Sequence, residues 1–462
     1  MSRIVIVGAG PTGLGAAHRL EEAGHRDYVV LDQASRPGGL ATSVVDDEGF
    51  TWDIGGHVQF SHYAYYDRAI DDAVDAWLTH ERESWVWIRG RFVPYPIQNN
   101  LHRLDAADCT RVLEGLERAA AARPNLPPAK TFGDWITLTF GEGLADLFMR
   151  PYNFKVWGYP LDRMNVSWMG ERVAVPDVAK IRRQVEERRD DVSWGPNRTF
   201  RFPLTGGTGA IWSGIARRLP AGRVRLESTV TSIDTEAREL HLAGGGREHY
   251  DALVTTMPLD RCCRLLSSST PDIDTAAASL TYSSVHVIGI GLHGPKPDTL
   301  GRKCWMYFPE SNSPYYRITV FSHYSPRNVP EGDGYWSLMA EVCESPAKPV
   351  YARGLVDEVL RAMLEDGLIL PETRVVSRWH HREEHGYPTP YVGRDEALAV
   401  LRRELEGRRI FSRGRFGAWK YEVSNQDHSF MQGVELANRL LTGEPEVTID
   451  DPDRANSGIF LR

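Results

Sequence analysis

The sequence predicts an α/β protein in which a doubly wound, Rossmann-like domain is split by two insertions, one helical and one an antiparallel β-sheet. Three observations predict this class. First, residues 3–33 run through a β-branched strand, a glycine turn, an Ala/Leu-rich helix and a second strand, which together form one βαβ unit. Second, apolar residues recur with helical spacing between about 105 and 190. Third, they alternate in short β-rich runs between about 280 and 380.

The end of the chain completes the split domain. The stretch "RRIFSRGRFGAWKYEVSNQDHSFMQGVELANRLL" predicts a strand, a long polar loop and a final helix that rejoin the first βαβ unit. We therefore expect the Rossmann-like domain at residues 1–80, 190–275 and 405–462. A helical domain is expected at 100–189, where Gly141 and Gly143 interrupt the second helix. The antiparallel sheet domain is expected at 81–99 and 276–404.

Composition argues against several classes of partner. Of the 462 residues, 42% are hydrophobic and 25% are charged, as in ordinary globular proteins. The net charge of −8 comes without a long basic block, which argues against nucleic acid and anionic membranes. No apolar run approaches the roughly 20 residues of a membrane span, and the N-terminus carries no secretion signal. The five scattered cysteines lack metal-binding spacing and suit a reducing compartment. We therefore expect a cytoplasmic protein without a metal site, and an oligomer is not excluded.

A nucleotide fingerprint opens the chain. Gly8, Gly10 and Gly13 form GxGxxG directly after the first strand and at the start of a helix. Such a turn lets backbone N–H groups approach a pyrophosphate at a helix N-terminus. Asp32 ends the second strand, 19 residues after Gly13, where an acid is expected to hold ribose hydroxyls. Because strand, helix and acid agree, we predict a dinucleotide site.

The next stretch, "SRPGGLATS", separates FAD from NAD as the dinucleotide. Its Arg36, Gly38 and Gly39 resemble the second glycine signature of the glutathione-reductase and amine-oxidase class of flavoproteins. The resemblance implies a split FAD-binding domain of that class, with the backbone passing close to FAD. The alternative is an ordinary Pro-Gly-Gly loop.

The chain resembles the UDP-galactopyranose mutases, and in particular their eukaryotic branch, in stretches that run nearly end to end. They include "GGHVQFSHY", "VPYPIQNN", "DLFMRPYNFKVW", "WGPNRTFRFP", "YYRITVFSHYSP" and "SRGRFGAWKYEVSNQDHSFM". The resemblance implies an isomerase that interconverts UDP-galactopyranose and UDP-galactofuranose without net oxidation. It also implies that N5 of reduced FAD attacks the anomeric carbon, UDP leaves, the covalent flavin–sugar adduct opens and recloses, and UDP returns. Eukaryotic relatives are reduced by NADPH, so NAD(P)H is the expected reductant.

The resemblance also assigns roles to residues. Gly55 and Gly56 would let the chain run along the flavin, with His57 at its N5 edge and Phe60 against the sugar; a loop histidine and a core phenylalanine are the alternatives. The catalytic set would be His57, Arg172, Asn197, Arg317 and Arg415. Arg415 and Gln426 would also lie beside the flavin. Uracil would meet Tyr95 and Gln98, ribose Asn153 and Trp157, and the sugar Asn197 and Trp305. The diphosphate would be held by Arg172, Arg317, Tyr307, Tyr324, Tyr387, Tyr421 and Asn425.

Two positions depart from the family pattern. Gln59 stands where relatives usually have an apolar residue, and Ile97 stands where they commonly have an aromatic one. Gln59 adds a hydrogen-bonding group that could signal a pyranose other than galactose, unless its side chain faces away from the pocket. At Ile97 the contact to uracil would come from the backbone.

Two other functions stay open on sequence grounds. An FAD-dependent oxidoreductase of the amine-oxidase type shares the fold and the glycines, but a diphosphate clamp of paired arginines is hard to explain for an apolar substrate. A flavin-bound protein without catalysis would be favoured by the loss of Arg172, Arg317 or His57, and all three are present.

Overall fold

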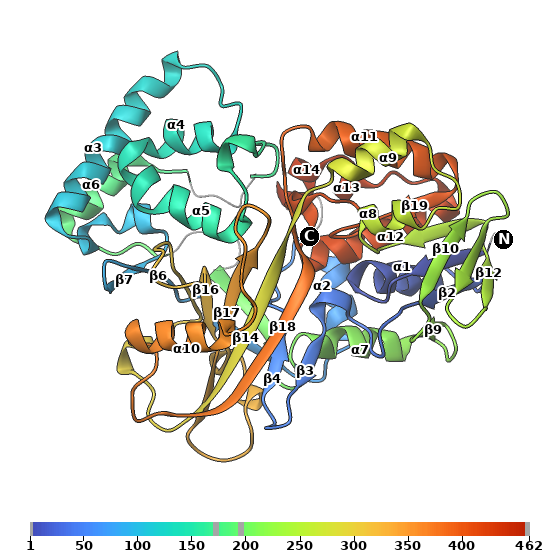
Figure 1. Cartoon of the computed structure of the whole chain (residues 1–462), viewed down its shortest axis with the longest axis horizontal. Helices are drawn as coiled ribbons and strands as arrows, with labels where there is room; N and C mark the ends of the chain where they lie inside the picture. Colours follow the sequence, from blue (N-terminus) through green and yellow to red (C-terminus); the bar gives the residue numbers. More distant parts are fainter. Residues whose placement is uncertain (1–2, 170–174, 193–197, 458–462) are drawn as a thin grey trace.

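The computed structural model describes residues 3–169, 175–192 and 198–457, which fold into three parts (Figure 1). They are a parallel sheet covered by helices, a seven-stranded sheet and a helical region. This arrangement confirms the predicted α/β class with a separate, mainly antiparallel sheet. The exact domain boundaries stay a prediction.

Five parallel strands form the first sheet, in the order β19-β13-β1-β2-β9. All residues of the two N-terminal strands are buried, as expected where helices or loops cover both faces of a parallel sheet. The last strand pairs with β13, so the end of the chain rejoins the N-terminal unit as predicted. The strands are β1 (Ile4–Val7), β2 (Tyr28–Leu31), β9 (Val224–Arg225), β13 (Ala252–Thr255) and β19 (Ile410–Ser412).

The two faces of this sheet carry different cores. Ile4 and Ile6 contribute to one core, and Val5 and Val7 to the other, because successive strand residues point to opposite faces. The first core includes residues of α1 (Pro11–Glu22), α2 (Ala64–Asp71), α7 (Gly209–Arg218) and α12 (Gln426–Thr442). The second includes residues of β10 (Val230–Asp234), β11 (Glu239–Leu242), α8 (Leu259–Arg264), α9 (Pro271–Ser279) and α11 (Arg394–Gly407), and β12 (Arg247–His249) pairs with β11.

The seven-stranded sheet has the order β18-β14-β17-β16-β15-β6-β7. All its pairs are antiparallel except β15 with β6, which is parallel. Its strands are β6 (Ser84–Ile88), β7 (Arg91–Pro94), β14 (Tyr282–His293), β15 (Trp305–Tyr307), β16 (Arg317–Val320), β17 (Tyr335–Glu344) and β18 (Arg374–Pro388). Helix α10 (Leu355–Glu365) packs into the core of one face.

Two small sheets complete the strands. The hairpin of β3 (Ser43–Val45) and β4 (Thr51–Asp53) leads into the "IGGHVQF" stretch, and Trp52 of β4 packs into a core with residues of β14 and β17. Strand β5 (Trp77–Glu81) pairs with β8 (Thr199–Pro203).

The helical region consists of α3 (Ala106–Ala122), α4 (Phe132–Leu144), α5 (Arg150–Trp157) and α6 (Val178–Glu187), with a π-helical turn at Ala145–Met149. Gly141 has a φ of +64° within α4, which confirms the predicted interruption there, whereas Gly143 keeps a helical backbone. A Cβ at Gly141 would lie 2.3 Å from the Gly115 carbonyl oxygen, so α3 and α4 touch backbone to backbone. Among the described residues, no helix has both the length and the apolar character that a membrane span needs.

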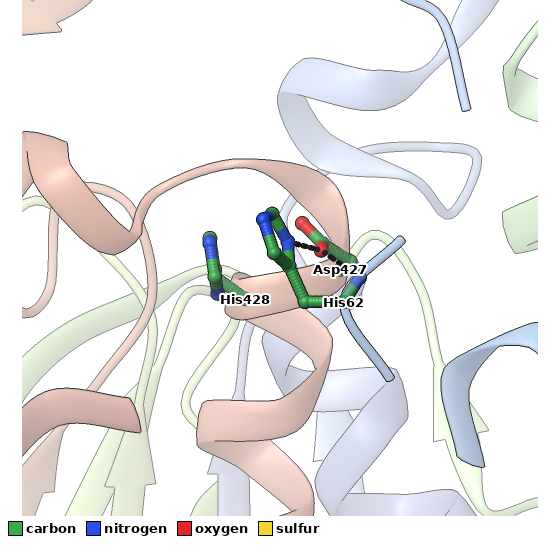
Figure 2. Close-up of side chains that lie close together, drawn as sticks. All are labelled: His62, Asp427 and His428. Atoms are coloured by element: carbon green, nitrogen blue, oxygen red, sulfur yellow. Dashed lines mark hydrogen bonds and ion pairs between the residues drawn. The ribbon is translucent and has the colours of Figure 1, made fainter. Parts of the chain in front are cut away.

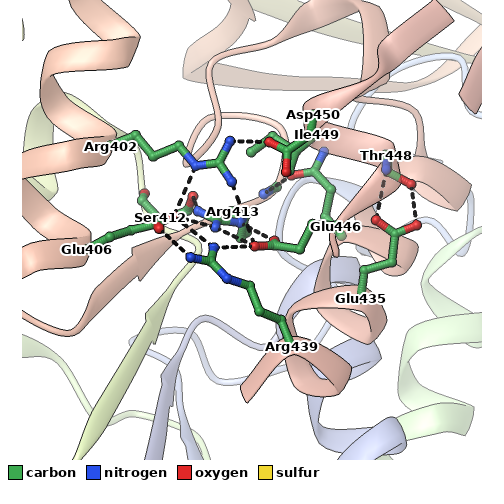
Figure 3. A network of polar contacts seen from close by, with 12 residues as sticks. Arg402, Glu406, Ser412, Arg413, Glu435, Arg439, Glu446, Thr448, Ile449 and Asp450 are labelled. Carbon is green, nitrogen blue, oxygen red and sulfur yellow. Dashed lines mark hydrogen bonds and ion pairs between the residues drawn. The ribbon is translucent and has the colours of Figure 1, made fainter. Parts of the chain in front are cut away.

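A buried ion-pair network anchors the C-terminal segment to the parallel sheet (Figure 3). Arg413 follows β19, and its Nε and Nη2 donate to both carboxylate oxygens of Glu446 at 2.6 and 2.8 Å. Glu406 and Arg439 extend the network on either side. It holds α13 (Val447–Asp450), which precedes α14 (Pro452–Ser457), against the strand end that leads to Arg415.

Candidate active site

The first glycine turn is packed so closely that it leaves no room for side chains at Gly8 and Gly13. Gly8 has a φ of +110°, and a Cβ there would lie 2.0 Å from Thr256 Oγ1. A Cβ at Gly13 would lie 1.8 Å from the Gly8 carbonyl oxygen, so the helix packs directly on the turn. Gly10 caps α1, which leaves the N–H groups of its first turn for an anion.

The acid at the end of β2 is tied to this turn. Asp32 Oδ2 accepts a hydrogen bond from the Ala9 N–H at 2.6 Å, and its Oδ1 accepts one from the Ala34 N–H at 2.8 Å. The carboxylate therefore has a fixed orientation next to the glycine turn.

The second glycine motif meets the first. The Gly38 N–H donates to the Ala9 carbonyl oxygen at 2.8 Å, and a Cβ at Gly39 would lie 3.4 Å from the Gly10 Cα. Gly38 and Gly39 both have positive φ, of +116° and +54°. Arg36 is exposed and donates to the Ser43 carbonyl oxygen at 3.2 Å. The residues present thus form one backbone cradle that fits a flavin dinucleotide.

The "GGHVQF" loop presents a histidine in its neutral form. Gly55 has a φ of +114° and accepts a hydrogen bond from the His57 N–H at 2.9 Å. Burial lowers the pKa of His57 to about 4, so its ring is neutral near pH 7. Its buried Nδ1 has no hydrogen-bond partner in the described part of the chain. Phe60 contacts the edge of His62, with ring centroids 5.7 Å apart.

Arg317, at the start of β16, is held by a buried carboxylate. Its Nε and Nη2 donate to Glu341 of β17 at 2.9 and 2.8 Å. The same carboxylate accepts from the Tyr316 hydroxyl at 2.6 Å and from the Gly56 N–H at 3.0 Å. The predicted diphosphate arginine and the predicted flavin loop therefore share one anion.

Tyrosines surround Arg317. The Tyr307 hydroxyl accepts from Trp305 Nε1 at 2.6 Å, and the ring centroids of Tyr307 and Tyr95 are 5.0 Å apart. Burial raises the pKa of Tyr387 to about 12, although the charge of Arg317 opposes the shift. Tyr324 is buried, which raises the pKa of its hydroxyl, and the charge of Arg317 opposes this shift as well. The hydroxyls stay protonated near neutral pH and can act as donors.

Arg415 joins the tyrosines to the segment just before α12. Its guanidinium lies 5.0 Å from the ring centroid of Tyr387 and 5.7 Å from that of Tyr421. Its Nη2 donates to the Gly386 carbonyl oxygen at 2.9 Å, and its Nη1 donates to Ser424 Oγ at 2.8 Å. The ring of Trp157 packs edge-on against Tyr421 at 4.8 Å, so the helical region borders this cluster.

The remaining predicted residues have these positions. Asn153 donates to the Met149 carbonyl oxygen one helical turn earlier, at 2.7 Å. Gln98 is 4% exposed. Asn425 caps α12, and Gln426 begins it and accepts from Trp212 Nε1 at 3.0 Å. Arg172 and Asn197 lie outside the described residues, so their placement stays a prediction.

The two departures from the family pattern are buried in protein. Ile97 is fully buried in the core of the helical region. Gln59 is 3% exposed, and its Oε1 accepts from the Tyr66 hydroxyl at 2.5 Å in the core around α2. Gln59 is therefore covered by the protein, whereas His57 and Phe60 are partly exposed.

Comparisons with known proteins agree with this geometry. Residues 11–441 match the family described as flavin-containing amine oxidoreductases. A solved structure of reduced UDP-galactopyranose mutase is 49% identical in sequence, with a TM-score of 0.96 over 99% of this chain and 98% of that chain. The chain belongs to the UDP-galactopyranose mutase family. The match to flavin-containing proteins also makes it a flavoprotein, as the glycine cradle indicates.

More distant structures share only the fold with this mutase-family chain. A CLA-producing fatty acid isomerase from P. acnes is 16% identical, with a TM-score of 0.65 over 96% of this chain and 99% of that chain. Wild-type putrescine oxidase bound to putrescine is 14% identical, with a TM-score of 0.63 over 95% of this chain and 99% of that chain.

Sequence reasoning missed two groups in this mutase-family site. Glu341 accepts directly from Arg317 and lies outside the quoted family stretches. Tyr316 lies within "YYRITVFSHYSP" but received no role, and its hydroxyl donates to the same carboxylate. A signal was present, because Glu341 interrupts the apolar run "LMAEVC" in the middle of the strand, and a buried acid needs a partner.

A second missed group joins His62 to the first turn of α12 (Figure 2). His62 Nδ1 and Asp427 Oδ2 are 2.8 Å apart, and the ring of His62 stacks on that of His428 at 4.7 Å. His428 Nδ1 is in turn 2.7 Å from the Tyr63 hydroxyl. Burial would raise the pKa of Asp427, but the two histidines outweigh it and lower that pKa to about 2. The charged aspartate in the first turn of α12 therefore braces the helix against the loop.

Proposed function

We propose that this protein is an FAD-dependent isomerase that interconverts UDP-galactopyranose and UDP-galactofuranose. One observation carries the proposal: a half-buried arginine among tyrosines shares a carboxylate with the loop that would face the flavin. A cationic clamp suits the diphosphate of a nucleotide sugar and does not suit the apolar substrate of an oxidase. The high identity to a mutase over nearly the full chain supports the same reaction.

The chain would hold FAD through the glycine cradle, with Asp32 at the ribose and the N-terminus of α1 at the pyrophosphate. When bound and reduced, FAD supplies a nucleophilic nitrogen to the anomeric carbon of the sugar. His57 would face the flavin edge as a neutral imidazole, since burial lowers its pKa to about 4. It can therefore accept a hydrogen bond there without adding a positive charge.

Arg317 and Arg172 would hold the diphosphate while it is detached from the sugar. Arginine suits this task because its planar fork binds phosphate oxygens in pairs. The hydroxyls of Tyr307, Tyr324 and Tyr387, with Tyr421 and Asn425, would add neutral donors. Keeping the leaving group in place makes its return intramolecular, a gain of roughly 7–11 kcal/mol at best.

The remaining positions would select the substrate. Tyr95 and Gln98 would bind uracil, and Asn153 and Trp157 would bind ribose. Phe60, Trp305, Asn197 and Arg415 would line the sugar. Reduction by NAD(P)H and a location in the cytoplasm belong to the same proposal, and an oligomer is compatible with it.

The test incubates the holoenzyme, reduced with dithionite, with UDP-galactopyranose and a panel of other UDP-hexoses and UDP-pentoses. Chromatography then separates furanose from pyranose products. We expect conversion by reduced enzyme only. Turnover by oxidised enzyme with consumption of oxygen would instead support the amine-oxidase type of reaction and refute the proposal.

Two clamp variants sharpen the test. Arg317→Ala and Arg172→Ala should abolish isomerisation and keep bound FAD, because neither residue belongs to the cradle. Arg378→Ala is the matched control, since Arg378 lies on β18 of the same sheet and pairs only with exposed Asp357 among the described residues. Undiminished turnover in Arg317→Ala would remove the clamp from the proposal.

A further inference from the structure

Glu341 lies where the nucleotide end and the flavin end of the site meet. It is in the middle of β17, opposite Arg317 on β16 and Val287 on β14. Its side chain is 3% exposed. Burial alone would raise the pKa of Glu341, but Arg317 and the Tyr316 hydroxyl outweigh it and lower that pKa. The residue is therefore a buried anion that depends on its donors.

Both carboxylate oxygens contact Arg317, and each accepts from one further donor. Oε1 accepts from Arg317 Nε and from the Gly56 N–H, at 2.9 and 3.0 Å. Oε2 accepts from Arg317 Nη2 and from the Tyr316 hydroxyl, at 2.8 and 2.6 Å, and Nη2 also lies 2.7 Å from Oε1. One oxygen thus binds the arginine and the glycine loop together, and any rotation of the carboxylate moves both contacts.

The pair leaves one edge of Arg317 open. The arginine side chain is 24% exposed, and within the described residues its Nη1 makes no hydrogen bond. Glu341 therefore decides which edge of the guanidinium can face a ligand. A planar fork that is held at one edge presents the other edge in a fixed direction.

The loop also packs against this pair. A Cβ at Gly56 would lie 3.2 Å from Glu341 Oε1, 3.4 Å from Arg317 Nη2 and 3.0 Å from Thr319 Oγ1. The backbone of Gly56 lies outside the left-handed region, so alanine there would act by contact rather than by backbone strain.

We propose that Glu341 is a positioning residue that holds the diphosphate arginine and the flavin-side loop in fixed positions relative to each other. The inference rests on the proposed function, because it assigns Arg317 to the diphosphate and the Gly56 loop to the flavin. A single change at Glu341 should then disturb both ends of the site. A residue that only stabilises the sheet would disturb neither ligand specifically.

The test uses the FAD-loaded enzyme with Glu341→Gln, which keeps the side-chain shape but replaces one acceptor oxygen with a donor amide. We expect UDP to bind at least about tenfold more weakly in calorimetry, equivalent to about 1.4 kcal/mol. We also expect a shift in the visible spectrum and the midpoint potential of the bound flavin. Glu344→Gln is the matched control, since Glu344 ends the same strand and accepts from Arg382 and His286. The control should leave both readouts unchanged.

A second variant approaches the pair from the flavin side. Gly56→Ala leaves Glu341 and Arg317 intact but crowds them, and we expect UDP affinity to fall about fivefold or more, as for overpacking of about 1 kcal/mol or above. This variant decides the question if Glu341→Gln purifies without flavin. UDP affinity within about twofold of wild type in either flavin-loaded variant, or a flavin spectrum unchanged in Glu341→Gln, overturns the positioning role.

The same preparations separate this inference from the proposed function. A wild-type enzyme that fails to isomerise UDP-galactopyranose refutes the function. A competent wild type beside variants with unaltered UDP affinity refutes only the role of Glu341.

Discussion

The buried pair of Arg413 and Glu446 offers a direct test of what holds the C-terminal segment in place (Figure 3). The two side chains are 1% and 0% exposed, and Glu446 Oε2 lies 2.6 Å from Arg413 Nε. The perturbation is Glu446→Gln, which keeps the shape and removes the charge. It leaves Arg413 buried with Glu406, 2.6 Å from its Nη2, as the remaining carboxylate partner.

The magnitude follows from these contacts. Breaking a buried pair by removing one partner costs about 3–5 kcal/mol, because it strands a buried charge. Since Glu406 still accepts from Arg413, we expect the low end, about 3 kcal/mol. For 462 residues unfolding together, the entropy of unfolding is about 1 kcal/mol per kelvin, so Tm should fall by roughly 3 °C.

The assay is thermal unfolding of the FAD-loaded enzyme, followed by tryptophan fluorescence and by release of flavin. Glu444→Gln is the control, because Glu444 lies in the same loop and is exposed. The double variant Arg413→Met, Glu446→Leu should recover most of the lost stability, since it strands no charge. An unchanged Tm in Glu446→Gln, or a double variant less stable than the single one, would refute the reasoning.

The remaining predictions concern the site. Gly8→Ala should yield protein with little flavin, seen as a low flavin-to-protein absorbance ratio, because its Cβ would lie 2.0 Å from Thr256 Oγ1 at a positive φ. Stability should fall as pH drops from 6.5 towards 4: burial lowers the pKa of His57 from 6.5 to about 4, so in that range the unfolded chain binds the proton and the native chain does not. Urea titrations should show this slope reduced in His57→Gln. Gln59→Ile should leave the ratio of kcat/KM between UDP-sugars unchanged, since Gln59 is buried against Tyr66; an altered sugar preference would contradict its placement.

Local motifs predicted most of the scaffold. The glycine turn, its helix and Asp32 are contiguous in sequence, so their geometry follows from backbone rules that need no distant partner. The interruption at Gly141 was predictable for the same reason, because glycine within a helical pattern marks a break. Helix α11 was not predicted, although its apolar positions Ala397, Leu398, Leu401 and Leu405 have helical spacing. They lie among charged residues, and the helical pattern becomes clear only from the core against which they pack.

The site was less predictable because its contacts join distant segments. The Gly56 N–H and Glu341 are 285 residues apart in the chain, and only strand pairing in the seven-stranded sheet brings the carboxylate to the loop. No spacing rule anticipates such a contact. The family resemblance identifies residues that touch ligands, but it does not identify the residues that orient those side chains.

Gln59 illustrates the same limit from the opposite direction. In the sequence it lies between His57 and Phe60, two residues assigned to the site, so adjacency suggested a contact with sugar. The structure directs its carboxamide oxygen to the hydroxyl of Tyr66, and the core around α2 covers it. In an extended segment, alternation separates Gln59 from Phe60 but puts it on the same side as His57, so sequence adjacency alone cannot decide whether Gln59 meets the ligand. A departure from a family pattern becomes evidence about specificity only after the side chain is placed, and at Gln59 the placement favours packing over sugar recognition.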